Sequence, residues 1–333
     1  MSDFGVIIIC CASDVHLARG CCASVRYFLG DVPICLVVDG DIDIDDFVHA
    51  YGVRIVRQAD FADPALRDSC FGWGRTKMIA HWEAPWPTFL LVDADTIVWG
   101  DVRRHARFDR FDMITDRHVA DAFPGTHNSI PLAAFLGEEE IAKTLHKLQH
   151  VKRWFYDAFE LGDAAPGLDW VATVDRLFCS GAFFARRGIL SRDRFLAFVA
   201  LGHDRPGLFS PGDMGVHNAL VMESGIRLDQ RSDLHQLVYM TTRVDLIRRF
   251  PVGPDGPIPN GEAVVIHWAG AQKPTLDARL SYSEPMTFFR RRFLQACGLA
   301  DRREIDRRLA EEDEVYSDFA PPPADASNAP AQR

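Results

Sequence analysis

Short apolar runs alternate with stretches of helical periodicity along the first third of the chain. Runs typical of buried strands cover residues 6–12, 34–38, 53–56 and 88–92, and helical spacing covers residues 18–29, 45–51 and 75–82. This alternation predicts parallel strands joined by helical crossovers. Ligands of such sheets collect beyond the carboxyl ends of the strands, where this chain carries Ser13, Asp14, Asp39 and residues 93–95.

The pattern in the rest of the chain is less regular. Further strands are predicted at residues 111–115, 177–184 and 264–268, and helices at residues 135–151, 214–223 and 288–308. Asp213 stands where it could cap the helix at 214–223, and Gly225 follows the end of that helix. The tail, residues 321–333, is rich in Pro and Ala and lacks aromatic residues, so we expect it to be disordered.

Composition narrows the class of protein. The chain has 333 residues, of which 47% are hydrophobic and 25% charged, as in a globular protein with a sizeable core. Its formal net charge of -10 argues against a general nucleic-acid-binding protein, which would need a basic surface. The first apolar run is far shorter than the roughly 20 residues that span a bilayer, and no basic residue precedes it. These features predict a cytoplasmic protein, with peripheral membrane contact left open.

Eight cysteines are spread along the chain without a C-x-x-C pair. That spacing disfavours a structural zinc site. Cysteines inside apolar runs, such as Cys10 and Cys35, are typical of small core residues. We therefore expect free, mostly buried thiols, with disulfides or metal ligation as the alternative.

The sharpest candidate for chemistry is Asp93-Ala94-Asp95, at the end of the strand predicted at residues 88–92. Residues two apart on an extended chain point the same way, so both carboxylates can face one side. Two carboxylates repel each other unless a positive charge lies between them, and Mn²⁺ or Mg²⁺ would also leave positions open for phosphate oxygens. The alternative is an ordinary strand-ending turn, in which Asp is common.

A second candidate follows the apolar run at residues 264–266, where His267 is followed by Gly270 and Lys273. A neutral imidazole at His267 could be a third metal ligand. Lys273 could place positive charge on a departing diphosphate. The alternative is a partly buried histidine in a strand–turn unit with a lysine in solvent.

Weaker candidates lie on either side of these segments. Gly181 permits the close approach of a ligand or of another part of the backbone. Asp213 places a carboxylate at a helix start, where simple capping is the alternative. Lys77 lies shortly before the strand at residues 88–92 and could contact a nucleotide sugar, although a solvated helix face explains it equally well.

Taken together and in this order, these segments resemble a retaining glycosyltransferase of the GT-A fold. The most similar family contains glycogenin and the bacterial lipopolysaccharide glucosyl- and galactosyltransferases, family eight in the usual classification. The resemblance covers residues 6–274 in patches. It is carried by Ala12-Ser13-Asp14-Val15-His16, Thr76-Lys77-Met78, Asp93-Ala94-Asp95, Cys179-Ser180-Gly181, Gly212-Asp213-Met214 and the segment from His267 to Pro274.

This resemblance implies an α/β fold of the GT-A type, with a Rossmann-like mixed sheet flanked by helices. A single GT-A domain would cover residues 1–284, with a donor-binding half at about 1–116 and an acceptor-side half at about 117–284. Residues 285–320 would form a helical extension, followed by the tail at residues 321–333.

The resemblance also implies a division of labour around a nucleotide-sugar donor, most often UDP-linked, and a carbohydrate or glycoconjugate acceptor. Asp93, Asp95 and His267 would hold Mn²⁺ or Mg²⁺, and Lys273 would stabilise the leaving phosphate. Asp213 would stabilise positive charge on the sugar. The remaining donor contacts implied are Ala12, Ser13, Asp14 and Asp39 at the base and ribose, Lys77 and Asp116 at the sugar, and Ala94, Gly181 and Gly270 around them.

Some positions depart from the family pattern. Cys179 stands in place of an Asn that usually faces the sugar, and Met214 in place of a Gln near the reacting carbon. A non-catalytic protein that binds a nucleotide sugar is therefore the first alternative. A sugar nucleotidyltransferase is disfavoured because no glycine lies between Val6 and Arg19, and a metal-dependent phosphoesterase is a weaker option.

Two further segments have open interpretations. Residues 117–176 include Trp154 and Trp170 and could shape an acceptor site, or they could form ordinary helical packing. The basic segment at residues 290–292 lies among phenylalanines and could rest on an anionic membrane surface, or the helix could pack on its own domain.

Overall fold

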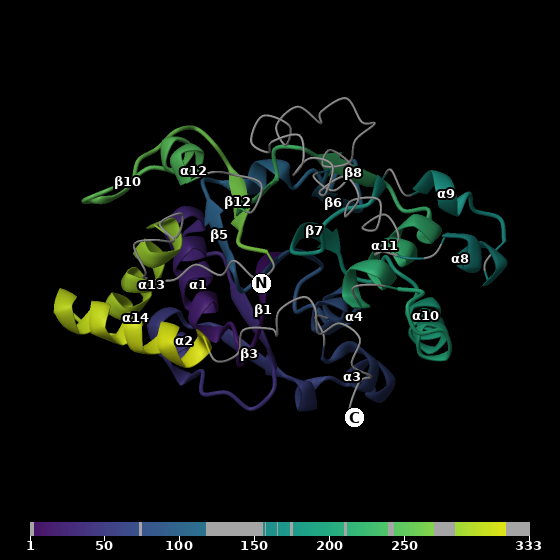
Figure 1. Ribbon diagram of the computed structural model, residues 1–333, viewed down its shortest axis with the longest axis horizontal. Helices are drawn as coiled ribbons and strands as arrows, with labels where there is room; N and C mark the ends of the chain where they lie inside the picture. Colours follow the sequence, from purple (N-terminus) through teal and green to yellow (C-terminus); the bar gives the residue numbers. More distant parts are fainter. Residues whose placement is uncertain are drawn as a thin grey trace, which may run out of the picture.

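A mixed seven-stranded sheet forms the centre of the computed structural model. The structure describes residues 3–72, 75–117, 156, 158–164, 166–173, 176–209, 212–238, 243–269 and 284–317. The strand order is β3-β2-β1-β4-β7-β6-β8 (Figure 1). These strands are β1 (Phe4–Cys11), β2 (Ile34–Asp39), β3 (Arg54–Arg57), β4 (Thr88–Asp93), β6 (Met113–Asp116), β7 (Ala182–Arg186) and β8 (Leu228–Arg231). The first four in this order run parallel, β7 is antiparallel to both of its neighbours, and β8 is parallel to β6.

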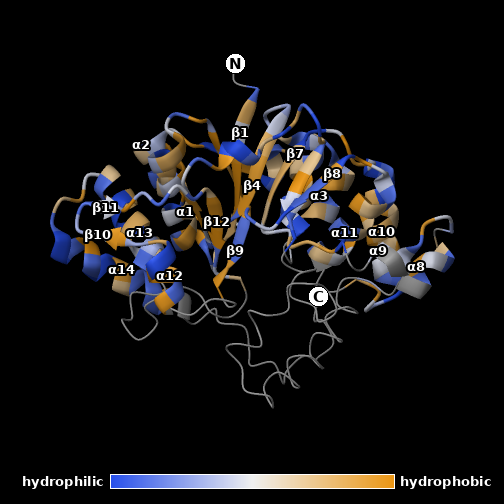
Figure 2. Cartoon of the chain, turned by 90° about the horizontal axis from the view of Figure 1, so that it is seen from above, coloured by the Kyte–Doolittle hydropathy of each residue, from blue (hydrophilic) through white to orange (hydrophobic). Residues whose placement is uncertain are grey.

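Helices cover both faces of this sheet (Figure 2). One face carries α1 (Val15–Leu29), α2 (Asp45–Tyr51) and α13 (Glu284–Ala296), and α14 (Arg302–Ser317) packs on α13. The other carries α3 (Pro64–Cys70), α4 (Ala80–Glu83), α10 (Arg192–Asp204) and α11 (Gly212–Ser224). Side chains of a strand alternate between its two faces. Val6 and Ile8 of β1 accordingly join one core and Ile7 and Ile9 the other. Because both faces are buried, the strands are continuous apolar runs.

A second, three-stranded sheet lies beside the end of β4. It contains β5 (Thr96–Trp99), β12 (Val264–His267) and β9 (His235–Leu237), with β12 in the middle. β12 pairs antiparallel with β5 and parallel with β9. The remaining described elements are short: β10 (Val252–Gly253), β11 (Gly256–Pro257), α8 (Ala158–Ala164), α9 (Trp170–Thr173), α12 (Arg243–Arg249), and the 3-10 turns η1 (Gln58–Asp60), η2 (Arg75–Ile79) and η3 (Val102–His105).

The predicted strands and helices of the first third are confirmed to within a few residues. Three expectations need correction. The apolar run at 177–184 becomes strand only from Ala182, because residues 177–181 lead toward the end of β4. The segment at 75–82 begins as the 3-10 turn η2 before α4. The helix expected at 288–308 is two helices, because the chain turns at Gly298, whose φ is 96°. The helix predicted at 135–151 and the tail at 321–333 lie outside the described residues.

Two arginines of the basic segment of α13, Arg290 and Arg291, are paired with carboxylates of α14. Arg290 is 1% exposed and bonds to Glu312 and Asp313 of α14. Phe289 and Phe293 are buried in the core that lies against α1. These side chains therefore hold the two C-terminal helices on the domain and are not free for the membrane contact considered above. None of the described helices combines the length and the apolar sequence that a bilayer crossing requires.

All eight cysteines are free thiols, as expected. Six of them are buried, and Cys11 and Cys297 are half-buried.

A buried histidine pair joins α4 to α11. The Nε2 atoms of His81 and His217 lie 2.9 Å apart, and both side chains are fully buried. The ring of His81 stacks on that of Phe183 in β7. Burial lowers the pKa of His81 to about 3 and that of His217 well below its ordinary value. Both histidines are therefore neutral in the folded chain near neutral pH.

We expect the free energy of unfolding to fall as the pH drops below about 6.5, the ordinary pKa of histidine. Below that pH the unfolded chain protonates both histidines and the folded chain does not, so each contributes a slope of up to about 1.4 kcal/mol per pH unit. Urea unfolding across this pH range should show His81→Phe losing about one histidine's share of the slope. The substitution keeps an aromatic ring against Phe183, and an unchanged slope would contradict the interpretation.

Candidate active site

The two carboxylates of Asp93 and Asp95 flank a turn rather than an extended strand. β4 ends at Asp93, the chain turns through Ala94 and Asp95, and β5 begins at Thr96. The hydroxyl of Thr96 donates to the carbonyl oxygen of Asp93 at 2.8 Å and closes the turn. The sequence predicted that an extended backbone would point both carboxylates the same way, and that backbone geometry is wrong. The turn nevertheless brings both carboxylates toward one place.

Strand pairing brings His267 to this turn. β12 runs antiparallel to β5, with His267 opposite Thr96, and the backbone N–H of Trp268 donates to the carbonyl oxygen of Asp95 at 3.0 Å. Nε2 of His267 consequently lies 3.2 Å from Oδ1 of Asp95 and 3.9 Å from Oδ2 of Asp93. One ligand atom from each of the three residues lies within 4.8 Å of the others.

This trio attracts positive charge. His267 is 4% and Asp95 is 5% exposed. Burial alone would lower the pKa of His267, but the carboxylate of Asp95 outweighs it and raises the pKa to about 10. Carboxylate oxygens are the ligands that Mn²⁺ and Mg²⁺ prefer, and Mn²⁺ also accepts imidazole. The donor set therefore fits the divalent cation that the sequence predicts.

A buried lysine joins the turn to α11. Nζ of Lys77, in η2, donates to Oδ2 of Asp93 at 2.9 Å and lies 3.1 Å from Oδ2 of Asp213. Burial would lower the pKa of Lys77, but the carboxylates of Asp213 and Asp93 outweigh it and raise the pKa well above its usual value. The hydroxyl of Ser180 donates to the same oxygen of Asp213 at 2.8 Å. The sequence suggested Asp213 as the N-cap of this helix. Because α11 begins at Gly212, Asp213 lies instead inside its first turn.

Gly181 lies against His267 and the end of β4. The backbone N–H of Asp93 donates to the carbonyl oxygen of Gly181 at 3.0 Å. A β-carbon built on Gly181 would lie 2.2 Å from Cε1 of His267 and 3.0 Å from Oδ2 of Asp93. Only glycine lets the imidazole lie this close to the turn, because real β-carbons do not approach other atoms so closely.

Behind His267 lies a chain of buried polar groups, of which only His235 was not among the residues singled out from the sequence. Nδ1 of His267 lies 2.9 Å from Nε2 of His235, and Nδ1 of His235 lies 3.0 Å from Oδ2 of Asp116. The other oxygen of Asp116 accepts from the backbone N–H of Cys179 at 2.9 Å. Asp116 is fully buried with both oxygens engaged, so its partners in this structure are His235 and Cys179. In the sequence, the only feature that could have indicated a buried His235 is its place between Leu234 and Leu237.

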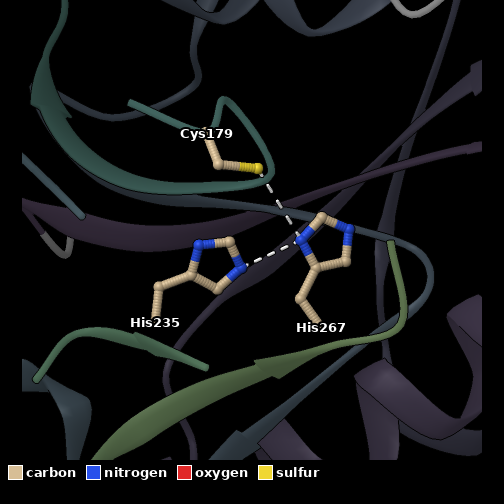
Figure 3. A group of neighbouring side chains, drawn as sticks. All are labelled: Cys179, His235 and His267. Atoms are coloured by element: carbon tan, nitrogen blue, oxygen red, sulfur yellow. Dashed lines mark hydrogen bonds between the residues drawn. The ribbon is translucent and has the colours of Figure 1, made fainter. Parts of the chain in front are cut away.

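The side chain of Cys179 completes this group (Figure 3). Its Sγ lies 4.0 Å from Nδ1 of His267, the same nitrogen that contacts His235. Burial raises the pKa of the Cys179 thiol. The amide of Asn218, in α11, bonds to both the N–H and the carbonyl oxygen of Phe178 and holds this segment in place.

The residues predicted at the base and ribose lie at the neighbouring strand ends. Cys11, the last residue of β1, is opposite Asp39 of β2. Asp14 accepts from the backbone N–H of Cys11 at 2.7 Å, and Ala12 and Ser13 are exposed between them. Oδ2 of Asp39 accepts from the N–H of Gly72 and the hydroxyl of Thr76, which positions the segment that leads to Lys77.

The structure thus brings Asp93, Ala94, Asp95, Gly181 and His267 together, with Lys77 and Asp213 beside them. Gly270 and Lys273 lie outside the described residues. Most of the segment considered for the acceptor, residues 118–155, also lies outside them.

No family model matches this sequence, and no curated protein matches it either. Solved structures do match. The bifunctional glycosyltransferase WbbM aligns with a TM-score of 0.50 and 12% identity, over 95% of this chain and 51% of that one. The galactosyltransferase LgtC, solved with donor and acceptor sugar analogues, aligns with a TM-score of 0.48 and 12% identity, over 90% of this chain and 98% of that one. Mouse xyloside xylosyltransferase 1 aligns with a TM-score of 0.46 and 12% identity, over 80% of this chain and 98% of that one.

The likeness to WbbM shows that this chain has the fold of GT-A glycosyltransferases. The predicted fold class, a mixed sheet flanked by helices, is therefore confirmed. At this level of identity the match carries the fold and not the activity.

We expect Gly181→Ala to weaken Mn²⁺ binding by roughly 10- to 100-fold, because the added methyl group displaces His267 from the turn. Isothermal titration with Mn²⁺ measures the change. Gly162→Ala in α8 is the matched control, since its β-carbon would meet only Cδ1 of Trp170, at 3.5 Å. Equal Mn²⁺ affinity in the two variants would contradict the proposed role of the close contact.

Proposed function

We propose that this protein is a metal-dependent glycosyltransferase that moves a hexose from a nucleotide-diphosphate sugar, UDP-linked, to a hydroxyl group of a carbohydrate or glycoconjugate. The observation that carries the proposal is the meeting of Asp93, Asp95 and His267 at the carboxyl end of β4. Ligands of parallel sheets bind at such strand ends. Retention of configuration rests on the family resemblance alone.

Asp93, Asp95 and His267 would hold Mn²⁺ or Mg²⁺, which when bound supplies positive charge to the donor diphosphate. Lys77 connects this group to Asp213 through two short contacts, so the two carboxylates keep fixed positions relative to each other. Asp213 would stabilise the positive charge that develops on the sugar as its bond to the diphosphate breaks. Lys273 would add positive charge at the leaving phosphate.

The nucleoside part of the donor would lie at the ends of β1 and β2. Ala12 and Ser13 are exposed there, and Asp14 and Asp39 lie beside them. Asp116 is fully buried, so we assign it to the support of His235 rather than to the sugar.

One observation favours a second candidate, a non-catalytic protein that binds a nucleotide sugar. Met214, which stands where the family carries a Gln, packs against the apolar core on the α10–α11 face. A thioether offers only a weak acceptor to a sugar. Both candidates bind the donor, and only the enzyme turns it over.

The first test measures thermal stability with a panel of nucleotide sugars, each with and without Mn²⁺. A ligand that binds only the folded chain stabilises it by about 2.7 kcal/mol at a hundredfold excess over Kd. We expect a Mn²⁺-dependent rise in melting temperature with one UDP-sugar. Release of UDP from that donor, on its own or with an acceptor, then separates the enzyme from the binder. No shift with any nucleotide sugar would refute the proposal.

We expect Asp95→Asn to abolish the Mn²⁺-dependent shift while leaving the fold intact, because it removes the charge closest to His267. Asp68→Asn, an exposed position on α3, is the matched control. Circular dichroism checks the fold of both variants. If Asp95→Asn kept the metal-dependent shift, the metal assignment would be wrong.

A further inference from the structure

The second ring nitrogen of His267 faces a different set of ligands from the first. Nε2 points to Asp93 and Asp95, whereas Nδ1 lies 2.9 Å from Nε2 of His235 and 4.0 Å from Sγ of Cys179. Figure 3 shows the sulfur and the His235 nitrogen converging on this one atom. The three ligand atoms all lie within 4.8 Å of one another.

These separations are close to those around a single zinc ion. With zinc at about 2.0 Å from nitrogen and about 2.3 Å from sulfur in a tetrahedral arrangement, two nitrogens lie about 3.3 Å apart and nitrogen and sulfur about 3.6 Å apart. The observed 2.9 Å and 4.0 Å differ from these values by a few tenths of an ångström. The ligand atoms of the third pair, Cys179 and His235, lie within 4.8 Å of each other, so the side chains must rotate to enclose the ion.

Strand pairing builds the arrangement. His235 begins β9 opposite Val265 of β12, and Val265 and His267 point to the same face of that strand. The two rings stack at 4.9 Å between centroids with 16° between their planes. Cys179 faces them from the segment before β7, and all three side chains are buried.

Each imidazole has a carboxylate beside the ring nitrogen that faces away from this group. Oδ2 of Asp116 lies 3.0 Å from Nδ1 of His235, and Oδ1 of Asp95 lies 3.2 Å from Nε2 of His267. A carboxylate that accepts the proton of one ring nitrogen leaves the lone pair of the other nitrogen free for a metal, as in carboxylate–histidine–zinc triads. Once the proton between Nδ1 of His267 and Nε2 of His235 has left, both histidines can present a lone pair toward the sulfur.

We propose that Cys179, His235 and His267 form a binding site for Zn²⁺ or a similar thiophilic divalent ion. The metal forms one bond to each residue, and two protons leave to solvent, one from the Cys179 thiol and one from the hydrogen bond between Nδ1 of His267 and Nε2 of His235, because the thiolate and the neutral imidazole are the forms that coordinate. Water occupies the fourth position, as in open three-ligand zinc sites. The thiolate distinguishes this site from the trio of Asp93, Asp95 and His267, whose carboxylates suit harder ions.

The two sites exclude each other because they share His267. A neutral imidazole has one lone pair, and it lies on Nδ1 for the soft site and on Nε2 for the hard site. Zn²⁺ bound at Cys179 would therefore remove one ligand from the proposed Mn²⁺ site. This consequence rests on the proposed function, whereas the zinc site itself does not.

Cobalt(II) is the probe for the site, because its bond to a thiolate produces a sulfur-to-metal absorption band in the near ultraviolet. We expect one equivalent of Co²⁺ to produce this band in the metal-free wild-type chain. Cys179→Ala and Cys179→Ser should lack it, and Cys297→Ser, at the half-buried cysteine after α13, should keep it. In the two Cys179 variants, Zn²⁺ affinity should fall by more than roughly 10- to 100-fold, which is the cost of losing an outer-shell partner.

Absence of the band in the wild-type chain, or a band of equal strength in Cys179→Ala, would overturn the proposal. The wild-type result needs no variant, so a folding defect in either substitution leaves the proposal testable.

Mn²⁺ paramagnetic resonance tests the competition. Zn²⁺ can also replace Mn²⁺ directly at Asp93, Asp95 and His267, so we expect the wild-type chain to release bound Mn²⁺ at a lower Zn²⁺ concentration than Cys179→Ala does. Equal concentrations for the two chains would overturn the competition. Simultaneous binding of both ions by the wild-type chain would overturn the shared use of His267. A cobalt band in a chain that binds no Mn²⁺ would support the soft site and count against the proposed function instead.

Discussion

Negative charge at the carboxyl end of β4 is the constraint on which the site depends. Asp93, Asp95 and Asp213 meet there with little water to screen them, and unpaired carboxylates in such a place are costly. Lys77 compensates Asp93 and Asp213 directly, and its raised pKa reflects that pairing. Asp95 has His267 as its close cationic partner, and its charge raises the pKa of that imidazole to about 10. A divalent cation between these groups would relieve the same imbalance.

The two sheets together hold these charges in place. The large sheet ends β4 at Asp93, and the antiparallel pairing of β5 with β12 carries His267 back to the turn. Because Gly181 has no side chain, the imidazole can lie close to Asp93. Behind the imidazole, Asp116 and His235 orient the ring. The position of His267 is thus determined on one side by carboxylates and on the other by a second histidine, so its two ring nitrogens face different groups.

The strands of the first third were predictable because helices bury them on both faces. β1, β2 and β4 are nearly continuous apolar runs, and such runs are visible in a single sequence. β8 was not predicted, because all four of its residues are only half-buried and show no alternation. The break between α13 and α14 was missed because the helical pattern of apolar residues continues across Gly298. The residues of the candidate site followed from motif types, yet the turn at Asp93-Ala94-Asp95 was expected to be extended.

The sequence by itself determined the apolar core strands, the carboxylates at their ends and the position of the glycine that admits a close neighbour. These are local properties, set by residue type and spacing. Only the tertiary structure decided which groups meet. Asp116 and His235 are 119 residues apart, Cys179 and His267 are 88 apart, and each pair is joined through strand pairing or packing that leaves no trace in local spacing. The absence of C-x-x-C pairs disfavoured a structural zinc site, because sequence spacing reveals only ligands that are close together in the chain. Ligands that are far apart in the chain, such as Cys179 and His267, leave no such pattern.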